Sequence, residues 1–395
     1  MAKFLKDGPI QEDMPVFRSR MSDLQLFDVI VYMRSLHDVQ ASLSQSPPPV
    51  LDGAYSYVAL DGAIRVYDME RDYKIVKQIR IKGMNELRGI VASPKTGLLH
   101  VSFDGLDRAD QIGGLACLDL ATDELLWSHT YAPGVDSMAL SPDGTTIFMP
   151  GGEADLRPDK GEWLILDALS GDERSRLAFG TSPHNSLVGP EGRFVYLAGA
   201  RSNELGVLDA ATNSIVRKIG PFSAGVRPFT LTSDGKLALV NVNALVGFEV
   251  ADLASGEVLH RVEVEGAPIE KRHMLQAPSH GIALSPDEKE AWVSDVFNGF
   301  VHIFDVSGLP GRPKFLQSIP VRRPGLFPTW IQFNRGGRFV HVSNGAIIDA
   351  TSREIQRWIA PSRYYMEVHF REGKPVAAFP RYGVGYANAT WWSGD

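Results

Sequence analysis

The sequence predicts an all-β protein: a seven-bladed β-propeller with four antiparallel strands in each blade, preceded by a short helical N-terminal segment. Three observations lead to this prediction. A strand–turn–strand pattern recurs along the chain, an aspartate ends a later apolar run in each repeat, and the C-terminal region holds a strand pair that belongs to no repeat. A period of roughly 40–50 residues with four strands in each repeat is typical of propellers.

The strand–turn–strand pattern is clear in "MALSPDGTTIFMPGG" (138–152) and "SLVGPEGRFVYLAGA" (186–200). Each segment has a short apolar run, a turn rich in Pro, Asp, Glu or Gly, and a second run in which apolar residues alternate. This pattern favours two antiparallel strands joined by a tight turn. Residues at the same place in six such turns lie 43 to 53 residues apart: Pro94, Pro142, Pro190, Ser233, Pro286 and Arg335.

A third apolar run in each repeat ends in aspartate and a turn of small residues, as in "LILDALSGDE" (164–173). An aspartate side chain can accept hydrogen bonds from backbone N–H groups two or so residues further on, which closes a turn into the next strand. Seven repeats carry this aspartate, which sets the blade count: Asp68, Asp119, Asp167, Asp209, Asp252, Asp305 and Asp349.

The two ends of the repeat region predict how the ring closes. The first repeat begins at about Tyr55 and lacks an inner strand, whereas residues 366–379 form a spare strand pair. Pairing the two would close the ring and remove both sheet edges. We therefore expect a helical segment at 1–37, a Pro/Ser-rich linker at 38–54 and the propeller at 55–390.

The segments "AWVSDVFNGFVHIFD" (291–305) and "FVYLAGARSNELGVLD" (194–209) resemble the YVTN β-propeller family, named after a Tyr-Val-Thr-Asn run at this strand. The resemblance spans about residues 55–386 and recurs in every repeat. It implies the propeller fold. It implies little about activity, because propellers carry many unrelated functions.

The segment "DMPVFRSRMSDLQLFDVIVYMRSLH" (13–37) predicts a helix that is apolar on nearly all sides, with Ser22 and Gln25 forming a capping box at its start. Its order Met-Pro-x-Phe, Met-Ser-Asp and Tyr-x-Arg-Ser-Leu resembles the C-terminal part of class I cytochromes c. In that family the methionine is the axial haem ligand, which corresponds to Met14.

No Cys-x-x-Cys-His motif precedes this segment, and the chain has one cysteine, Cys117. Haem c is therefore expected only in a longer, N-terminally extended product. Three interpretations stay open: a reading frame begun too late, a relic helix docked on the propeller, or an ordinary N-terminal helix.

Composition excludes several function classes. The net charge is −7 and the pI about 5.8, with no basic run, which argues against nucleic-acid binding and against a polybasic membrane patch. The longest apolar run is too short and interrupted to span a bilayer. A single cysteine excludes an internal disulfide and a structural thiolate zinc site. We expect Cys117, within "LACLDL", to be a buried small apolar residue.

Candidate site residues follow from propeller geometry, in which the innermost strands line a central channel and ligands bind at its mouth. The residue six positions before each turn anchor should lie where an inner strand begins. This gives Arg88, Asp136, His184, Arg227, His280, Thr329 and, in the closing strand, about Met366 or Glu367. The long insertions 151–163 and 265–281 are further candidates, since long loops tend to cover sites.

Two interpretations of this ring compete. In the first, the arginines bind a carboxylate or phosphate, while the histidines bind a metal, a haem-like ring or a transferable proton. In the second, polar residues fill a wet tunnel. Two histidines are a poor metal set, so Asp136 or His369 would have to join them. No catalytic residue and no metal site is assigned.

We expect a ligand-binding or redox-accessory propeller, part of a bacterial cytochrome c–propeller fusion, with a small molecule or a redox protein as partner. Alternatives are a propeller enzyme, either a lactonase-like hydrolase or an oxidoreductase subunit, and a protein–protein interaction scaffold. The family resemblance implies a periplasmic or extracellular setting, although the sequence shows no export signal. The cofactor and the oligomeric state are not predicted.

Overall fold

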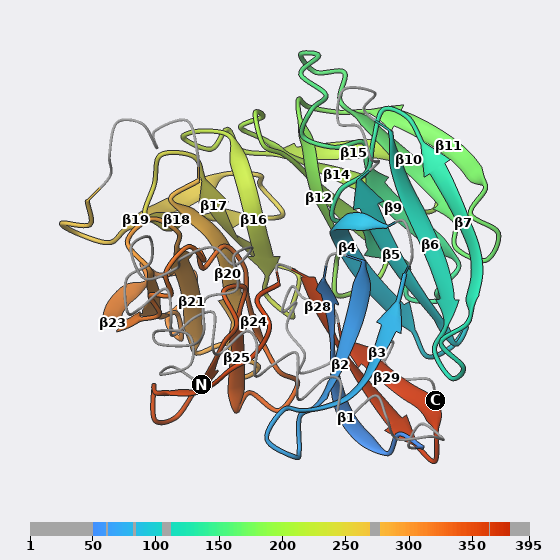
Figure 1. Cartoon of the computed structure of the whole chain (residues 1–395). Helices are drawn as coiled ribbons and strands as arrows, with labels where there is room; N and C mark the ends of the chain where they lie inside the picture. Colours follow the sequence, from blue (N-terminus) through green and yellow to red (C-terminus); the bar gives the residue numbers. More distant parts are fainter. Residues whose placement is uncertain are drawn as a thin grey trace, which may run out of the picture.

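The computed structural model describes residues 50–60, 62–81, 84–104, 112–268, 277–362 and 364–379. Seven antiparallel sheets are arranged radially around a common axis (Figure 1), six with four strands and one with five. The predicted seven-bladed fold is confirmed. The predicted helix within 1–37, Met14 included, and residues 38–49 of the predicted linker lie outside the described residues.

Each blade is built from consecutive strands, with one exception at the point of closure. The blade that follows the closing blade in the chain contains β4 (Asn85–Ser93), β5 (Leu98–Asp104), β6 (Gly113–Asp119) and β7 (Leu125–Tyr131). The next blade contains β8 (Ala139–Leu140), β9 (Thr146–Pro150), β10 (Glu162–Asp167) and β11 (Glu173–Ala178). The one after it contains β12 (Pro183–Val188), β13 (Phe194–Gly199), β14 (Leu205–Asp209) and β15 (Ser214–Ile219). The fourth of these blades contains β16 (Val226–Leu231), β17 (Leu237–Val242), β18 (Gly247–Asp252) and β19 (Val258–Glu263). The fifth contains β20 (Ser279–Leu284), β21 (Glu290–Asp295), β22 (Phe300–Asp305) and β23 (Lys314–Pro320). The sixth contains β24 (Ile331–Phe333), β25 (Phe339–Val342), β26 (Ala346–Asp349) and β27 (Ile355–Trp358).

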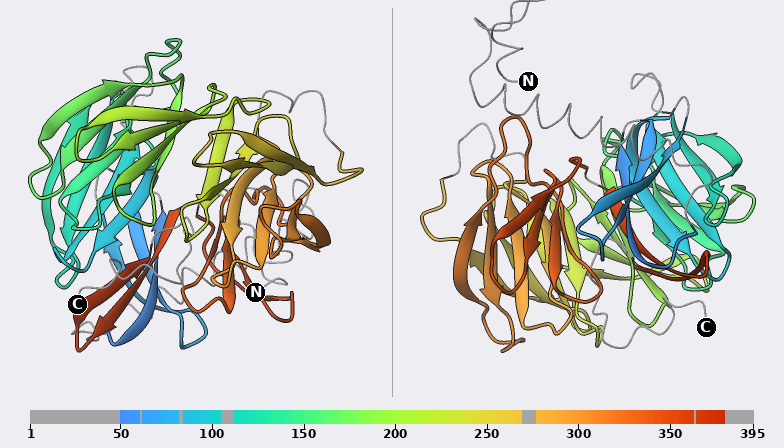
Figure 2. Two further views of the ribbon diagram at one scale, coloured as in Figure 1. Left: turned by 180° about the vertical axis from the view of Figure 1, so that it is seen from behind. Right: turned by 60° about the horizontal axis from the view of Figure 1, so that its bottom comes forward.

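The closing blade joins the two ends of the repeat region. Its sheet order is β29-β28-β1-β2-β3, and its strands are β1 (Gly53–Leu60), β2 (Ala63–Asp68), β3 (Lys74–Arg80), β28 (Tyr364–Arg371) and β29 (Lys374–Phe379). Strand β28 pairs antiparallel with β1, from Gly53 opposite Phe370 to Ala59 opposite Tyr364. The blue and red strands therefore lie side by side when seen from behind (Figure 2). The predicted closure by the spare strand pair is confirmed.

The innermost strands of the seven blades together surround the axis, and in the closing blade this strand is β28. Contacts join β4 to β8, β8 to β12, β12 to β16, β16 to β20, β20 to β24, and β28 to β4. Middle strands such as β17 are buried along their whole length, because neighbouring blades cover both faces. Outer strands such as β15 alternate exposed and half-buried residues instead. The apolar core therefore lies between the blades, and the polar starts of the inner strands remain at the axis.

The turn chemistry follows the sequence prediction. In every blade the Oδ1 atom of the turn aspartate accepts hydrogen bonds from backbone N–H groups two or three residues further on. Asp119, for example, accepts them from Ala121 at 2.9 Å and from Thr122 at 2.8 Å. The same contact is made by Asp68, Asp167, Asp209, Asp252, Asp305 and Asp349. These turns fix where each outer strand begins. Cys117 is fully buried as expected, and burial raises its thiol pKa to about 12.

Candidate functional site at one mouth of the channel

Five predicted residues meet at the end of the channel where the inner strands begin. Arg88 lies on β4, His184 on β12, Arg227 on β16 and His280 on β20, while Asp136 precedes the short strand β8. The inner strands all start at this face, because every blade runs outward from its first strand. Residues that are distant in sequence thereby become neighbours.

Asp136 is the buried centre of the cluster. Its Oδ2 atom lies 3.1 Å from His184 Nδ1 and 3.4 Å from Arg88 Nη2, and its Oδ1 atom accepts the Ser137 N–H at 2.9 Å. The Asp136 carbonyl accepts the Ser102 hydroxyl at 3.0 Å. A buried carboxylate is tolerated when its lone pairs are satisfied in this way. Asp136 therefore has a fixed position from which it orients its neighbours.

His184 has its tautomer set by Asp136. An ionised carboxylate can only accept a hydrogen bond, so His184 donates Nδ1–H to it, and Nε2 carries the lone pair in the neutral ring. This Nε2 atom is buried and has no hydrogen-bond partner within the described residues. The ring packs 5.2 Å from the His280 ring and 5.9 Å from Trp330. A basic nitrogen is therefore held beside the axis.

His280 packs against the rings of His184 and Trp330. Its ring centroid lies 5.0 Å from that of Trp330 in an edge-on arrangement, and its Nδ1 lies 3.3 Å from the carbonyl oxygen of Thr329. Because a carbonyl only accepts, His280 donates Nδ1–H here. Both histidines thus have their Nδ1 atoms engaged by fixed acceptors.

Glu153 joins the cluster from the loop between β9 and β10. Its Oε1 atom lies 2.7 Å from Arg227 Nη1 and 3.7 Å from His184 Nδ1, and its Oε2 atom lies 4.0 Å from Arg88 Nη2. Sequence reasoning singled out the insertion 151–163 by its length but not this residue. A loop residue has no strand register from which its position could be counted, so only the loop length signalled it.

Charge decides the protonation state of Glu153. Burial raises its pKa, but His184 and His280, when their rings are protonated, and the guanidinium groups of Arg227 and Arg88 outweigh that effect and hold the pKa of Glu153 well below the usual range. The Arg227 guanidinium is fixed in turn, because its Nε donates to Asn243 Oδ1 at 2.7 Å. The mouth therefore presents an ionised carboxylate held against a fixed guanidinium.

Asp136, Glu153 and His184 could also offer one ligand atom each to a metal ion, since such atoms lie within 4.8 Å of one another. These groups are already hydrogen-bonded: His184 donates to Asp136, and the two carboxylates accept from the guanidinium groups of Arg88 and Arg227. A divalent cation there would have to displace these hydrogen bonds and would lie near the two guanidinium groups, which repel it. The donor set suits proton and anion chemistry better than a metal.

Of the other positions predicted for the ring, Thr329 lies beside His280 through its carbonyl oxygen, and the positions in the closing strand lie elsewhere. Thr329 uses its N–H and hydroxyl on Ser343 Oγ, at 2.6 and 3.0 Å. The closing strand reaches the mouth at Tyr364, whose ring lies 6.4 Å from Trp330, rather than at Met366 or Glu367. Its register is set by pairing with β1, not by distance from a turn anchor.

Glu367 and His369 belong to the far part of β28. Glu367 accepts the Arg335 N–H at 2.7 Å, in the turn of the last blade. His369 places Nε2 2.6 Å from Glu367 Oε1 and packs its ring 5.1 Å from Phe379. The structure therefore does not bring His369 together with His184 and His280.

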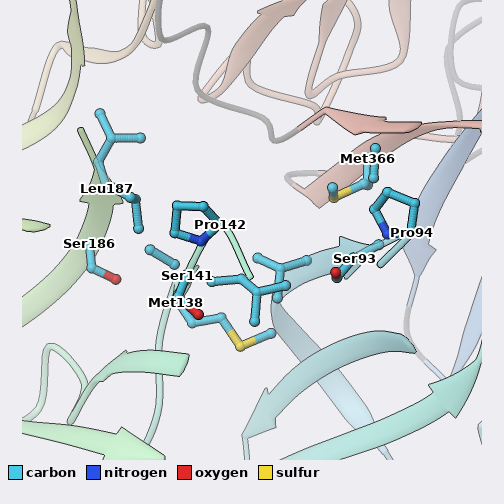
Figure 3. A pocket seen from close by; sticks show the side chains of 14 residues that line it. Ser93, Pro94, Met138, Ser141, Pro142, Ser186, Leu187 and Met366 are labelled. Atoms are coloured by element: carbon cyan, nitrogen blue, oxygen red, sulfur yellow. The ribbon is translucent and has the colours of Figure 1, made fainter. Parts of the chain in front are cut away.

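A cavity of about 40 Å³ lies at the opposite, turn end of the inner strands (Figure 3), where sequence reasoning expected nothing. Pro94 and Pro142, two of the turn anchors, line it together with Met138, Leu187 and Met366. It has room for a few water molecules. Its lining is apolar apart from serines, so this cavity offers no acid–base group.

The fold and the site define a seven-bladed β-propeller with a charged histidine–arginine–carboxylate cluster at one axial mouth. No family model and no curated protein matches the sequence. Among solved structures, the periplasmic gluconolactonase PpgL of Pseudomonas aeruginosa is 16% identical, with 82% of this chain and 98% of that chain covered and a TM-score of 0.62.

Two further similar structures are a dehydrogenase and a synthase. Dihydro-heme d1 dehydrogenase NirN in complex with DHE is 14% identical, with 96% and 90% of the two chains covered and a TM-score of 0.53. Hydrazine synthase of Kuenenia stuttgartiensis is 18% identical, with 68% and 77% covered and a TM-score of 0.53. At these identities the likeness establishes the propeller fold and no shared activity.

Proposed function

We propose that this protein binds a small polar molecule at the mouth of its central channel, in contact with Arg88, Arg227 and His280. One observation carries the proposal: charged and titratable side chains from five blades converge there, and Glu153 links the guanidinium of Arg227 to the imidazole of His184. Buried ion pairs add little net stability compared with apolar packing. A cluster of this kind at the axis of the propeller is therefore better explained by function than by folding.

Hydrolysis of a cyclic ester is the second candidate, and the Asp136–His184 pair favours it. His184 Nε2 would take a proton from water as the hydroxide adds to the lactone carbonyl, and an arginine would stabilise the oxyanion. The ring C–O bond then breaks, and the proton returns to the leaving ring oxygen. The products are a hydroxyl group and a carboxylic acid, which ionises to a carboxylate and releases its proton to solvent. The gluconolactonase among the similar folds supports testing this chemistry first.

The experiment combines binding and turnover. Purified protein is incubated with five- and six-membered aldonolactones, acid release is followed by pH-stat, and binding is followed by calorimetry. The same measurements are made on His184→Ala and on His129→Gln, which alters an exposed histidine of the outer strand β7. Activity or binding lost only in His184→Ala supports the proposal. Equal values in both variants would leave the propeller as a scaffold without an axial site.

The redox-accessory role, YVTN-family membership and a periplasmic location are parts of the same proposal. The redox role depends on residues 1–37, so the test is the reading frame upstream of Met1: a Cys-x-x-Cys-His motif there supports it, and its absence ends it. The periplasmic name of the gluconolactonase supports the location. In the part of the chain that the structure describes, no helix has the length and apolar character needed to cross a membrane.

A further inference from the structure

We propose that Glu153 is a built-in substitute for the ligand: its carboxylate occupies the anion position of the mouth, and the ligand is a small organic carboxylate that displaces it. The inference rests on the proposed function, because it assigns a ligand class to the same site. It also fits the second candidate activity, since lactone hydrolysis releases a carboxylate in this position.

The contacts of Glu153 are those of a bound carboxylate. Arg227 donates Nη1–H to Oε1 at 2.7 Å, and positively charged or chargeable groups lie on two further sides, with His184 Nδ1 at 3.7 Å and Arg88 Nη2 at 4.0 Å. Proteins hold carboxylate ligands with charge-assisted bonds of this kind. The last two separations exceed hydrogen-bond length. Only the bond to Arg227 is therefore broken when Glu153 leaves.

The side chain of Glu153 is also more exposed than those of Arg88, Arg227, His184 and Asp136. Its side chain keeps 37% of its exposure, against 13% for Arg227 and 18% for Arg88. His184 and Asp136, at 5% and 1%, are enclosed. A ligand that arrives from solvent therefore meets Glu153 before it meets the buried partners.

The backbone at Glu153 is held while its side chain can turn. Ser182 donates its hydroxyl to the Glu153 carbonyl and its N–H to the Asp155 carbonyl at 2.8 Å, so the loop is tied to the next blade. Gly151 and Gly152 precede the residue, and Gly152 has a φ of +94°. Asp136 differs, because three groups hold its carboxylate. Rotation of the Glu153 side chain needs no movement of a strand.

Charge balance selects an anion as the incoming group. Among the charged groups of the described cluster, removal of the Glu153 carboxylate leaves Arg88 and Arg227 with the single negative charge of Asp136, an excess of one positive charge before either histidine is protonated. A ligand carboxylate restores neutrality, whereas an uncharged polyol does not. The strong preference of Glu153 for its ionised form agrees with this arrangement.

Sodium gluconate and the uncharged polyol sorbitol are the probes that test the inference, in calorimetric titrations of the wild type, Glu153→Gln, Glu153→Ala and Arg227→Gln. Glu162→Gln is the matched control, since Glu162 follows the same loop but pairs with Arg176 away from the axis. We expect gluconate to bind Glu153→Gln about tenfold more tightly than the wild type. Arg227→Gln should lose binding, Glu162→Gln should equal the wild type, and sorbitol should bind none of them.

Unchanged or weaker gluconate binding by Glu153→Gln and Glu153→Ala, with melting temperatures near that of the wild type, overturns the inference, because Glu153 would then contact the ligand or be irrelevant to it. Sorbitol binding as tight as gluconate binding overturns it as well. So does absence of gluconate binding in every variant. The lactone assay on His184→Ala is independent of these outcomes, so the proposed function can stand or fall separately.

Discussion

The carboxylate of Glu153 lies 2.7 Å from the guanidinium of Arg227, although the two residues are 74 positions apart in the chain. Glu153 belongs to the blade β8–β11 and Arg227 to the blade β16–β19, so the ion pair spans the blade that carries His184. This contact turns a ring of separate polar residues into one connected site. It also places an insertion, which the repeat does not require, directly at the axis.

Asp136→Asn tests how the proton is placed on His184. An amide at this position can donate to Nδ1, which would move the ring proton to Nε2 and remove the basic lone pair from that atom. We expect lactone hydrolysis to fall by roughly a hundredfold or more, with a smaller change in binding. The ¹⁵N shifts of the His184 ring report the tautomer directly. Asp234→Asn, in an exposed turn, is the control; unaltered ring shifts in Asp136→Asn would refute the assignment.

Phe370→Ala tests closure of the ring. Phe370 is buried on β28 and packs its ring 5.9 Å from Tyr55 and 6.3 Å from Tyr57 on β1. Truncation should lower the free energy of unfolding by about 3 kcal/mol, measured by urea denaturation. Phe315→Ala, on the outer strand β23 where the side chain is half exposed, should cost well under half as much. Equal costs would mean that the closing strand adds little to stability.

Gly192→Ala tests the contact between neighbouring turns. Gly192 has a φ of +72°, and an added Cβ would lie 2.6 Å from Cγ of Pro142 in the preceding blade. Gly97 has nearly the same φ, +71°, with open space around it. Gly97→Ala therefore measures backbone strain alone, about 1 kcal/mol. We expect Gly192→Ala to cost clearly more in urea denaturation; equal costs would show that the turns do not touch in solution.

Acid sensitivity should come from buried histidines. Burial lowers the pKa of His100 to about 4, although its bond to the Ala168 carbonyl opposes the shift, and burial lowers the pKa of His341 to about 3. Unfolded histidine has a pKa near 6.5, so between about pH 6.5 and 4 the unfolded chain binds more protons than the folded one. The contribution of these neutral histidines to the free energy of unfolding is therefore fully present above pH 6.5 and is lost as the pH falls.

For His100 alone this loss is on the order of 3 kcal/mol. His100→Gln should flatten the dependence of unfolding free energy on pH in this window, whatever its effect at neutral pH. His129→Gln, in an exposed position on β7, should keep the wild-type slope. A His100→Gln slope equal to that of the wild type would contradict the assignment.

Most of the fold follows from local rules that the sequence displays. The turn aspartates close their turns by bonds to nearby N–H groups, so Asp119 and its equivalents determine the repeat without tertiary information. The same repeat fixes strand register, which is why counting back from Pro94 and Pro142 reached Arg88 and Asp136. Wherever a residue is tied to the repeat, its position could be predicted.

The parts that could not be predicted are those that leave the repeat. Glu153 lies on an insertion, and its place at the axis depends on Ser182 of another blade. Tyr364 reaches the mouth because β28 takes its register from β1, which no turn anchor in that strand reveals. The apolar cavity at the turn end arises from how several inner strands meet, and side-chain packing of this kind has no signal in a single sequence.

A crystal structure of the protein with sodium gluconate tests the central claim most directly, because it shows at once whether the mouth takes an anion. We predict density for the ligand carboxylate against Arg227 and beside His280, with the Glu153 side chain turned away toward solvent. Density confined to the outer faces or to the apolar end of the channel, or a bound ligand beside an undisturbed Glu153–Arg227 pair, would contradict the claim.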